Sequence, residues 1–342
     1  MKYLPKFVVW ELTLACNAKC KHCASNAGPQ RSEELSTQEA FDLIDQLALA
    51  GTECIFLSGG EPTLRPDFYE IAKKIDESHL IYGFVTNGLT QLNIDFLKTY
   101  LPFAIGVSID GTEATHNGIR GMPDAFTRTW ANIRALVSNK LPVSIVTAVS
   151  KYNFKDLKRI ELDILHNKVG GWQLQLVIPE GRMDRSFMLN EQEYYELCKF
   201  IAKEKEDLKG IVNIVAADNL GYYGSCEGKL HNNPWVGCPA GKEVAGIESN
   251  GNIKACLSIM HPDALAGDIR GTRFSGIWNN DDLFSFFRNY DGTVGLCASC
   301  DRAPDCRGGC SATLAGFHHE LKREYPFCVK RYEAALDQKD NL

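Results

Sequence analysis

Segments typical of buried strands alternate with segments typical of amphipathic helices over about the first 180 residues of the chain. The strand-like segments are residues 6–12, 54–57, 81–85, 104–109, 143–149 and 172–178, and the helix-like segments are residues 36–50, 67–77, 94–100, 125–138 and 157–166. Six such units predict an α/β fold with a parallel sheet, right-handed crossovers and helices outside. Whether the sheet closes in part into a barrel or stays open, ligands are expected at the carboxyl ends of its strands.

The second half of the chain has a different pattern. Residues 191–205 and 329–339 are expected to be helices, but from about residue 211 onward glycine, asparagine and cysteine become frequent and strong periodicity disappears. A stretch of this kind cannot bury much core by itself, so we expect metal sites to hold it together.

Composition excludes several classes of protein. Among 342 residues, 44% are hydrophobic and 23% are charged, which is typical of a globular chain. The net charge of −6 argues against a nucleic-acid partner. No apolar run has the length of a membrane helix and the first residues lack the apolar core of a signal peptide, so we expect a cytoplasmic protein with no membrane partner.

Thirteen cysteines, an odd number, argue against a disulfide framework and favour metal or metal–sulfur sites.

The first group of cysteines follows the first strand directly. Cys16, Cys20 and Cys23 have the spacing C-x3-C-x2-C on one short loop. Three thiolates can hold three irons of a cubane cluster and leave the fourth iron open to another molecule. A zinc site that takes its fourth ligand from elsewhere is the alternative. A Ser-Gly-Gly-Glu-Pro segment, residues 58–62, follows the second strand and is expected to face the same pocket.

With these motifs in these positions, residues 7–182 resemble the radical SAM superfamily. The resemblance implies a partial (β/α)6 barrel and a 4Fe-4S cluster whose open iron is chelated by S-adenosylmethionine (SAM). It also implies reductive cleavage of SAM to a 5'-deoxyadenosyl radical, which abstracts a hydrogen atom from the substrate. The cofactor-binding residues implied by the match are Gly59, Gly60 and Glu61 in the glycine turn, Asn87 on the ribose side, and Ser108 and Arg120 at the SAM carboxylate. The ring of His22 is expected to pack near the adenine.

A second group of cysteines occupies the last third of the chain. It consists of Cys238, Cys256, Cys297, Cys300, Cys306, Cys310 and Cys328. Ligand chemistry alone allows one or two clusters, or one zinc site with spare thiols. The full arrangement resembles the SPASM domain, which implies two auxiliary 4Fe-4S clusters and three clusters in all. One would be held by Cys238, Cys256 and Cys310, and the other by Cys297, Cys300, Cys306 and Cys328.

One position departs from the SPASM pattern. Related proteins often have another cysteine six residues after the first, and here that position is Val244. Either Cys226 supplies the missing thiolate of the first auxiliary cluster, or an iron of that cluster is left open to water or substrate. Cys54 and Cys198 lie in apolar patterns and are expected to be core residues.

These features predict a radical SAM core over residues 1–185, a bridging region over 186–236 and a SPASM domain with a C-terminal helix over 237–342. The expected function is oxidative modification or crosslinking of a peptide or protein, as in a peptide maturase. The alternatives are radical oxidation, epimerisation or decarboxylation of a small molecule, and a non-catalytic electron carrier or zinc-stabilised binding protein. An external donor such as flavodoxin or ferredoxin, and a separate peptide-docking protein, are the expected partners. No motif identifies the catalytic acid or base, for which the candidates include Glu180, Asp218, Tyr222 and Tyr223.

Overall fold

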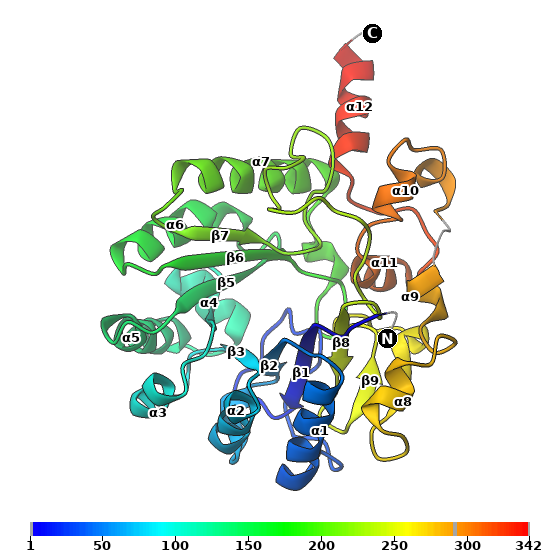
Figure 1. Ribbon diagram of the computed structural model, residues 1–342. Coiled ribbons are helices and arrows are strands. Elements are labelled where there is room, and N and C mark those ends of the chain that lie inside the picture. Colours follow the sequence, from blue (N-terminus) through cyan, green and yellow to red (C-terminus); the bar gives the residue numbers. More distant parts are fainter. Residues whose placement is uncertain (1–2, 290–292, 341–342) are drawn as a thin grey trace.

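The computed structural model describes residues 3–289 and 293–340, and its centre is one sheet in the order β10-β9-β8-β1-β2-β3-β4-β5-β6-β7 (Figure 1). The strands are β1 Phe7–Thr13, β2 Cys54–Gly59, β3 Ile81–Thr86, β4 Ile105–Ser108, β5 Val143–Val149, β6 Gly171–Leu176, β7 Asn213–Ala216, β8 Val244–Ile247, β9 Asn252–Lys254 and β10 Leu265–Asp268. Strands β1 to β7 are parallel to their neighbours. The edge strands are β7 and β10, so the sheet is a barrel that stays open, as the predicted α/β class with a partial barrel requires.

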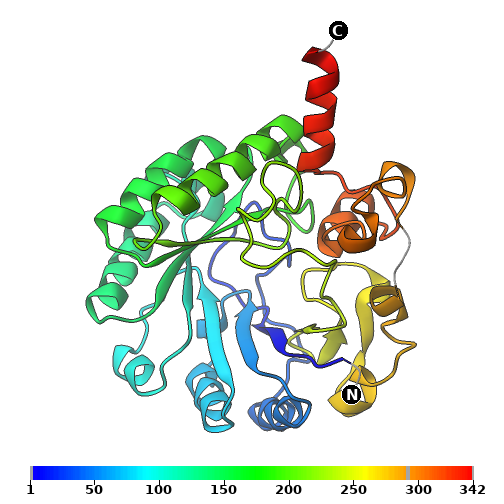
Figure 2. The same ribbon diagram turned by 45° about the horizontal axis from the view of Figure 1, so that its top comes forward.

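Helices cover the outer face of the parallel strands (Figures 1 and 2). They are α1 Thr37–Leu49, α2 Phe68–Glu77, α3 Ile94–Thr99, α4 Glu113–Arg120, α5 Ala125–Ser138, α6 Leu157–His166 and α7 Glu191–Asp207. A capping box begins α1, since Ser36 and Glu39 exchange hydrogen bonds. Buried apolar side chains from strands and helices form one continuous core, in which Val8, Trp10 and Leu12 of β1 are fully buried.

Two elements of the parallel part are absent from the prediction. Strand β7 extends the sheet beyond β6, and its four residues are too few for their exposed and buried alternation to mark a strand in the sequence. Helix α4 buries His116 and Arg120 together with Ile119, so polar side chains occupy the face that an apolar stripe normally marks.

The cysteine-rich half of the chain joins the same sheet. Strand β8 pairs in parallel with β1, and β9 and β10 continue from it in antiparallel pairing. The helices that follow are α8 Phe274–Trp278, α9 Ser285–Asn289, α10 Ala303–Cys306, α11 Ser311–His318 and α12 Val329–Asp340. Phe274, Trp278 and Phe284 are buried in the core that the barrel residues also form. This half therefore does not depend on metal sites alone, because part of its apolar surface packs against the barrel.

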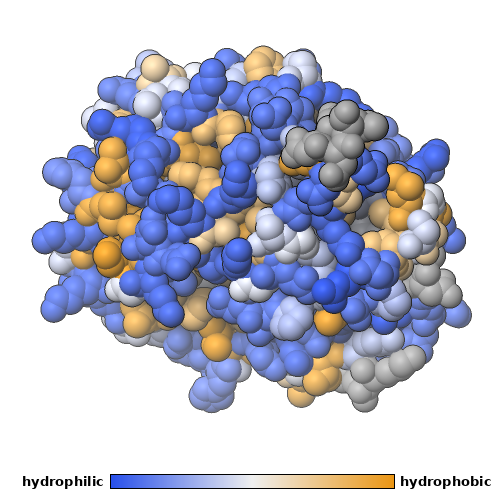
Figure 3. Space-filling model, turned by 90° about the horizontal axis from the view of Figure 1, so that it is seen from above, coloured by the Kyte–Doolittle hydropathy of each residue, from blue (hydrophilic) through white to orange (hydrophobic). Residues whose placement is uncertain are grey.

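The exterior of the molecule is polar on the face seen from above. Hydrophilic side chains cover most of that face, and apolar side chains lie between them in small groups (Figure 3). Within the described ranges, no helix has the length and apolar character needed to cross a lipid bilayer.

Candidate iron–sulfur and cofactor site

The three cysteines of the first motif lie on the loop that follows β1. The main-chain N–H of Cys16 donates to the carbonyl of Gly28 at 2.8 Å and closes the base of the loop. The thiol of Cys16 interacts electrostatically with those of Cys20 and Cys23, and Cys20 also interacts with Cys23. Burial is the main cause that raises the pKa values of Cys16 and Cys20. The sequence prediction that these three thiols face one small region agrees with this geometry.

The last turn of α4 supports the same loop. The N–H of Lys19 donates to the carbonyl of Arg120 at 3.2 Å, and the N–H of Lys21 donates to that of Ile119 at 2.9 Å. The helix ends at Gly121, whose φ of +70° is left-handed and whose added Cβ would lie 3.0 Å from the Lys19 oxygen. Free carbonyls at a helix end thus hold the cysteine loop through its main chain.

The glycine turn after β2 packs closely against the main chain at the beginning of the cysteine loop. A Cβ on Gly59 would lie 2.3 Å from the Thr13 oxygen, and one on Gly60 would lie 2.4 Å from the Ala15 oxygen. The N–H of Gly60 donates to the Thr13 carbonyl at 2.8 Å. Any side chain at these two positions would force the turn and the loop apart.

Glu61 has a structural role in this turn. Its fully buried carboxylate accepts the hydroxyl of Thr63 at 2.6 Å and the main-chain N–H of Asn87 at 2.7 Å. It therefore joins the ends of β2 and β3, and its contact with a cofactor stays a prediction. The side-chain amide of Asn87 donates to Asn17 at 2.7 Å and lies 3.9 Å from the sulfur of Cys16.

Asp110 pairs with Arg120 and His22 beside the cysteine loop. Its Oδ2 lies 2.6 Å from Nη2 of Arg120 and 3.2 Å from Nε2 of His22, and Nη1 of Arg120 lies 3.7 Å from the sulfur of Cys20. Burial alone would raise the pKa of Asp110, but the charges of Arg120 and His22 hold it well below its usual range. Nε2 of His22 is thus bound to a carboxylate, and the packing of its ring near the adenine stays a prediction. Burial also lowers the pKa of His116, whose Nδ1 accepts the Asp110 N–H, to about 4.

The remaining predicted cofactor contacts surround the same loop. Gly59 ends β2, Asn87 directly follows β3, and Ser108 ends β4. Ser108 and Arg120 are both buried, and Arg120 is the last residue of α4. The carboxyl ends of three neighbouring strands therefore meet at the cysteine loop, as a parallel sheet requires.

Sequence reasoning assigned no role to Gly181 and Arg182 in the turn that follows β6. Arg182 donates from Nε to the carbonyl of Cys20 and from Nη1 to that of Ala27, both at 2.9 Å. A Cβ on Gly181 would lie 2.4 Å from carbonyl oxygens of the cysteine loop. Oε1 of Glu180 is buried and has no hydrogen-bond partner within the described chain. The Gly-Arg pair after a predicted strand is the one feature of the sequence that could have indicated this turn. The sequence could not show that Arg182 binds Cys20, which lies 162 residues earlier.

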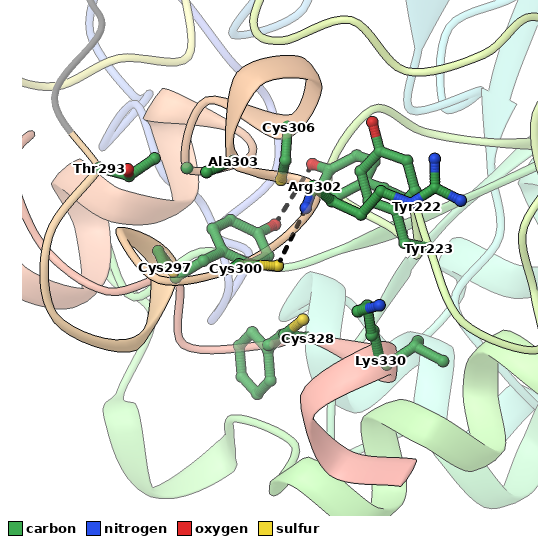
Figure 4. Close-up of a pocket in the computed structure, with 14 residues that line it drawn as sticks. Tyr222, Tyr223, Thr293, Cys297, Cys300, Arg302, Ala303, Cys306, Cys328 and Lys330 are labelled. Atoms are coloured by element: carbon green, nitrogen blue, oxygen red, sulfur yellow. Dashed lines mark hydrogen bonds between the residues drawn. The ribbon is translucent and has the colours of Figure 1, made fainter. Parts of the chain in front are cut away.

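Four cysteines of the second group line one cavity, shown in Figure 4. They are Cys297, Cys300, Cys306 and Cys328, the set predicted for one auxiliary cluster. The cavity measures about 50 Å³, several times the roughly 10–15 Å³ that a single water needs. Burial, followed by the neighbouring thiol of Cys328, raises the pKa of Cys306 to about 12.

The other three thiols of the second group also lie together. Cys310 interacts electrostatically with Cys238 and Cys256, and Cys256 interacts with Cys238. Burial raises the pKa of Cys256 to about 11. The sequence-predicted division into a group of three and a group of four thus matches the arrangement of these side chains.

Two buried tyrosines lie between the two groups of thiols. Tyr222, labelled in Figure 4, and Tyr325 line the cavity of the four-cysteine group. Their hydroxyls are 3.4 Å apart. Both rings also interact electrostatically with Cys310 of the three-cysteine group. Burial raises the pKa values of both hydroxyls far above the ordinary range.

Among the described residues, Cys226 shows no interaction with the three thiols, whose missing ligand it was one of two alternatives to explain. It interacts with Cys198 of α7, and the adjacent residue Ser225 donates its N–H to Glu333 of α12 at 3.0 Å. Cys198 is fully buried, as predicted, whereas Cys54 is only partly buried. Val244, at the position of the missing cysteine, begins β8.

The three groups of thiols fit clusters better than single ions. In the described residues, no group of three or more His, Cys, Asp or Glu side chains converges closely enough for one metal ion. The ligands of a cubane cluster bind different irons and are therefore spread more widely than those of one ion. Sulfur donors in groups of three and four favour iron–sulfur clusters over hard cations such as Mg²⁺.

Comparison with known proteins agrees with this reading. The family model described as "Radical SAM superfamily" matches residues 10–164, and the SPASM model, described as "Iron-sulfur cluster-binding domain", matches residues 238–301. The AdoMet-dependent heme synthase of Methanosarcina barkeri is 31% identical, with 97% of this chain and 98% of that protein aligned. The mycofactocin maturase MftC of Mycolicibacterium smegmatis is 30% identical, with 99% and 86% aligned.

The fold itself recurs in a solved structure. Streptococcus suis SuiB bound to S-adenosylmethionine superposes with a TM-score of 0.75 at 15% identity, over 95% of this chain and 76% of that one. The family matches imply 4Fe-4S clusters and SAM as cofactors. They also make the chain an enzyme, in place of the non-catalytic electron carrier or zinc-stabilised protein. This chain belongs to the radical SAM superfamily and carries a SPASM iron–sulfur domain.

Proposed function

We propose that this enzyme removes a hydrogen atom from a peptide or protein side chain and passes the remaining electron to an auxiliary cluster, so that the substrate is oxidised or crosslinked. The observation that carries the proposal is the meeting of the Cys16, Cys20 and Cys23 thiols beside the Gly59–Gly60 turn. When bound, the cluster and SAM together supply the 5'-deoxyadenosyl radical. Two further groups of thiols in the same molecule supply sites for an electron acceptor.

The residues around the first loop have separate tasks in this proposal. Cys16, Cys20 and Cys23 hold three irons and leave the fourth to the amino and carboxylate groups of SAM. Gly59 and Gly60 bring main-chain groups close to the SAM amino group. Arg120, fixed by Asp110 at 2.6 Å, grips the SAM carboxylate with its remaining N–H donors. Ser108 contributes a hydroxyl at the same carboxylate, and Asn87 lies on the ribose side.

The proposal of a peptide substrate rests on a buried carboxylate oxygen without a partner, in Glu180, and on the name of one relative. Glu180 follows β6, on the turn whose Arg182 binds the cysteine loop, and its side chain packs against Gly316 of α11. A buried carboxylate oxygen without a partner is costly unless a bound molecule donates to it. A peptide supplies such donors in its main-chain N–H groups. The name of the relative MftC, a mycofactocin maturase, also supports a peptide substrate.

The runner-up is a small molecule. The relative named heme synthase aligns along nearly its whole length, which favours a porphyrin-like substrate. Porphyrins with carboxylate side chains would meet Glu180 with charge of the same sign, and this favours the peptide. In either case we propose that a small electron-transfer protein such as flavodoxin or ferredoxin reduces the first cluster. A separate docking protein would present a peptide substrate.

Anaerobic reconstitution with SAM and dithionite tests the proposal. We expect about twelve irons per chain from three clusters, and release of 5'-deoxyadenosine. Replacing Cys16, Cys20 and Cys23 together by Ala should abolish this release and leave about eight irons. A triple variant that still cleaves SAM would refute the assignment of the first loop.

The substrate class is tested with two deuterated substrates. One is a short peptide, and the other is an iron porphyrin with carboxylate side chains. Deuterium in 5'-deoxyadenosine from the peptide alone supports the peptide. We expect Glu180→Gln to lower that transfer at least tenfold, while SAM cleavage without substrate is unchanged. Transfer from the porphyrin alone overturns the peptide in favour of the runner-up.

A further inference from the structure

One short turn contacts both cysteine-bearing parts of the molecule. It follows β6, and its residues 178–185 reach α11, the helix that begins directly after Cys310. A Cβ on Gly316 of α11 would lie 2.0 Å from Cγ2 of Ile178. Arg185 donates from Nη2 to the Gly316 carbonyl at 3.1 Å. Helix α11 therefore holds this turn in place from one side.

On its other side the turn is bonded to the first cysteine loop through Arg182. The main-chain N–H of Arg182 donates to the Cys23 carbonyl at 3.0 Å. Its guanidinium donates from Nε to the Cys20 carbonyl and from Nη1 to that of Ala27, both at 2.9 Å. A Cβ on Gly181 would lie 2.4 Å from the Cys23 oxygen, so the main chains of turn and loop touch. One residue thus binds three carbonyls of the loop, and two of them belong to cysteines.

The cysteine loop needs such support because it has little regular structure of its own. The structure places no helix or strand between Cys16 and Gly28. Inside the loop, the main-chain N–H of Cys23 donates to the Cys20 carbonyl over a long 3.4 Å. Among the residues that the structure describes, Arg182 is the one whose side chain donates to main-chain carbonyls of this loop.

The shape of the guanidinium suits this task. Its N–H groups form a rigid, planar fork, whereas a lysine ammonium is a single charge on a flexible stem. Cys20 and Ala27 lie on opposite sides of Cys23 in the sequence, so the fork joins two arms of the loop. The guanidinium also brings a fixed positive charge to the main chain that carries the thiolates. Arg182 is exposed, so its replacement leaves no cavity in the core.

We propose that Arg182 is a positioning residue for the first cluster. Its fork holds residues 20–27 in the arrangement that the irons require before they bind, and its charge raises the reduction potential of the bound cluster. Glu180, the proposed substrate contact, lies on the same turn, so substrate and cluster loop share one support. The inference rests on the proposed function, because it assumes a cluster on the first loop.

Three variants of the full chain test the assignment. Arg182→Gln removes both the fork and the charge, and Arg182→Lys keeps the charge without the fork. Arg185→Gln, on the same turn but bonded to α11, is the matched control. Hydrogen–deuterium exchange of each metal-free protein is measured in peptides from residues 16–28. After reconstitution, iron is counted and the midpoint of the first cluster is measured by redox titration with electron paramagnetic resonance.

We expect both Arg182 variants to exchange amide hydrogens in residues 16–28 roughly fivefold faster or more, because neither can bind both carbonyls. Arg182→Gln should also shift the midpoint of the first cluster to a more negative potential, whereas Arg182→Lys should leave it unchanged. The auxiliary midpoints should stay the same in both. If Arg182→Gln cannot hold the first cluster, loss of about four irons with about eight retained supports the proposal equally.

Three results would overturn it. The first is unchanged exchange in residues 16–28 of metal-free Arg182→Gln, and the second is an equal change in Arg185→Gln. The third is an unchanged midpoint in a fully loaded Arg182→Gln enzyme. Failure of the proposed function looks different, because the unaltered enzyme would then hold no iron or cleave no SAM after reconstitution.

Discussion

At the scale of single residues, Asp110 organises the side chains beside the first cysteine loop. It is fully buried, it binds Arg120 through two N–H groups at 2.6 and 2.7 Å, and it binds His22 at 3.2 Å. Arg120 in turn reaches the sulfur of Cys20. A single carboxylate thus orients the cation that we propose for the SAM carboxylate and fixes its distance from the cluster loop.

Asp110→Asn should therefore affect both stability and cofactor binding. Removing one partner of a buried ion pair leaves a buried charge, so we expect the free energy of unfolding to fall by about 3–5 kcal/mol. SAM affinity should fall at least tenfold because Arg120 is no longer held. Thermal unfolding and calorimetric titration with SAM measure the two effects. Asp124→Asn, which removes an exposed pair with Arg128, is the control and should cost about 0–1 kcal/mol. Unchanged SAM affinity in Asp110→Asn would contradict the positioning role.

At the scale of elements, the turn after β2 and the loop after β1 form one unit. Gly60→Ala places a Cβ 2.4 Å from the Ala15 oxygen, and main chain has to move to relieve that contact. We expect the variant to lose about four irons and SAM cleavage, while the auxiliary clusters remain. Iron analysis and 5'-deoxyadenosine assays measure this. The matched control is Gly118→Ala in α4, where an added Cβ meets no atom within 4 Å. A fully loaded Gly60→Ala protein would show that this contact is not needed.

How much of each element could be predicted depended on its length and on where its partners lie. Strands such as β5 have enough consecutive apolar residues to be recognised, whereas β7 and β8 have four residues each and are defined by pairing with distant strands. The cysteine groups were predictable because their spacing is local. The contacts of Asp110 with His22 and of Arg182 with Cys20 were not, because they join segments that are remote in the sequence.

At the scale of the whole molecule, the two halves share one sheet and one core. Strand β8 pairs with β1, and Arg270 after β10 forms an ion pair with Glu39 of α1 at 2.6 Å. Residues 293–328 depend less on that sheet. In the described part of this segment the longest regular element is α11, which has eight residues. Residues Leu314 and Phe327 of this segment join the shared core, whereas Cys297, Cys300, Cys306 and Cys328 surround a cavity that a cluster would fill.

Removal of iron should therefore reduce the protection of main-chain amides in residues 293–328 and leave that of β8 unchanged. We expect the metal-free enzyme to exchange amide hydrogens much faster than the loaded enzyme in peptides from residues 293–328, since the thiols there lose their common ligand. Peptides containing β8 should keep their protection, because β8 is hydrogen-bonded to β1 and its residues Ala245 and Ile247 are fully buried. Hydrogen–deuterium exchange with mass spectrometry compares both states, and reconstitution should restore the slow exchange. If protection falls equally in β8 and in residues 293–328, the clusters hold the whole sheet together, and the division between a packed half and a metal-dependent segment is wrong.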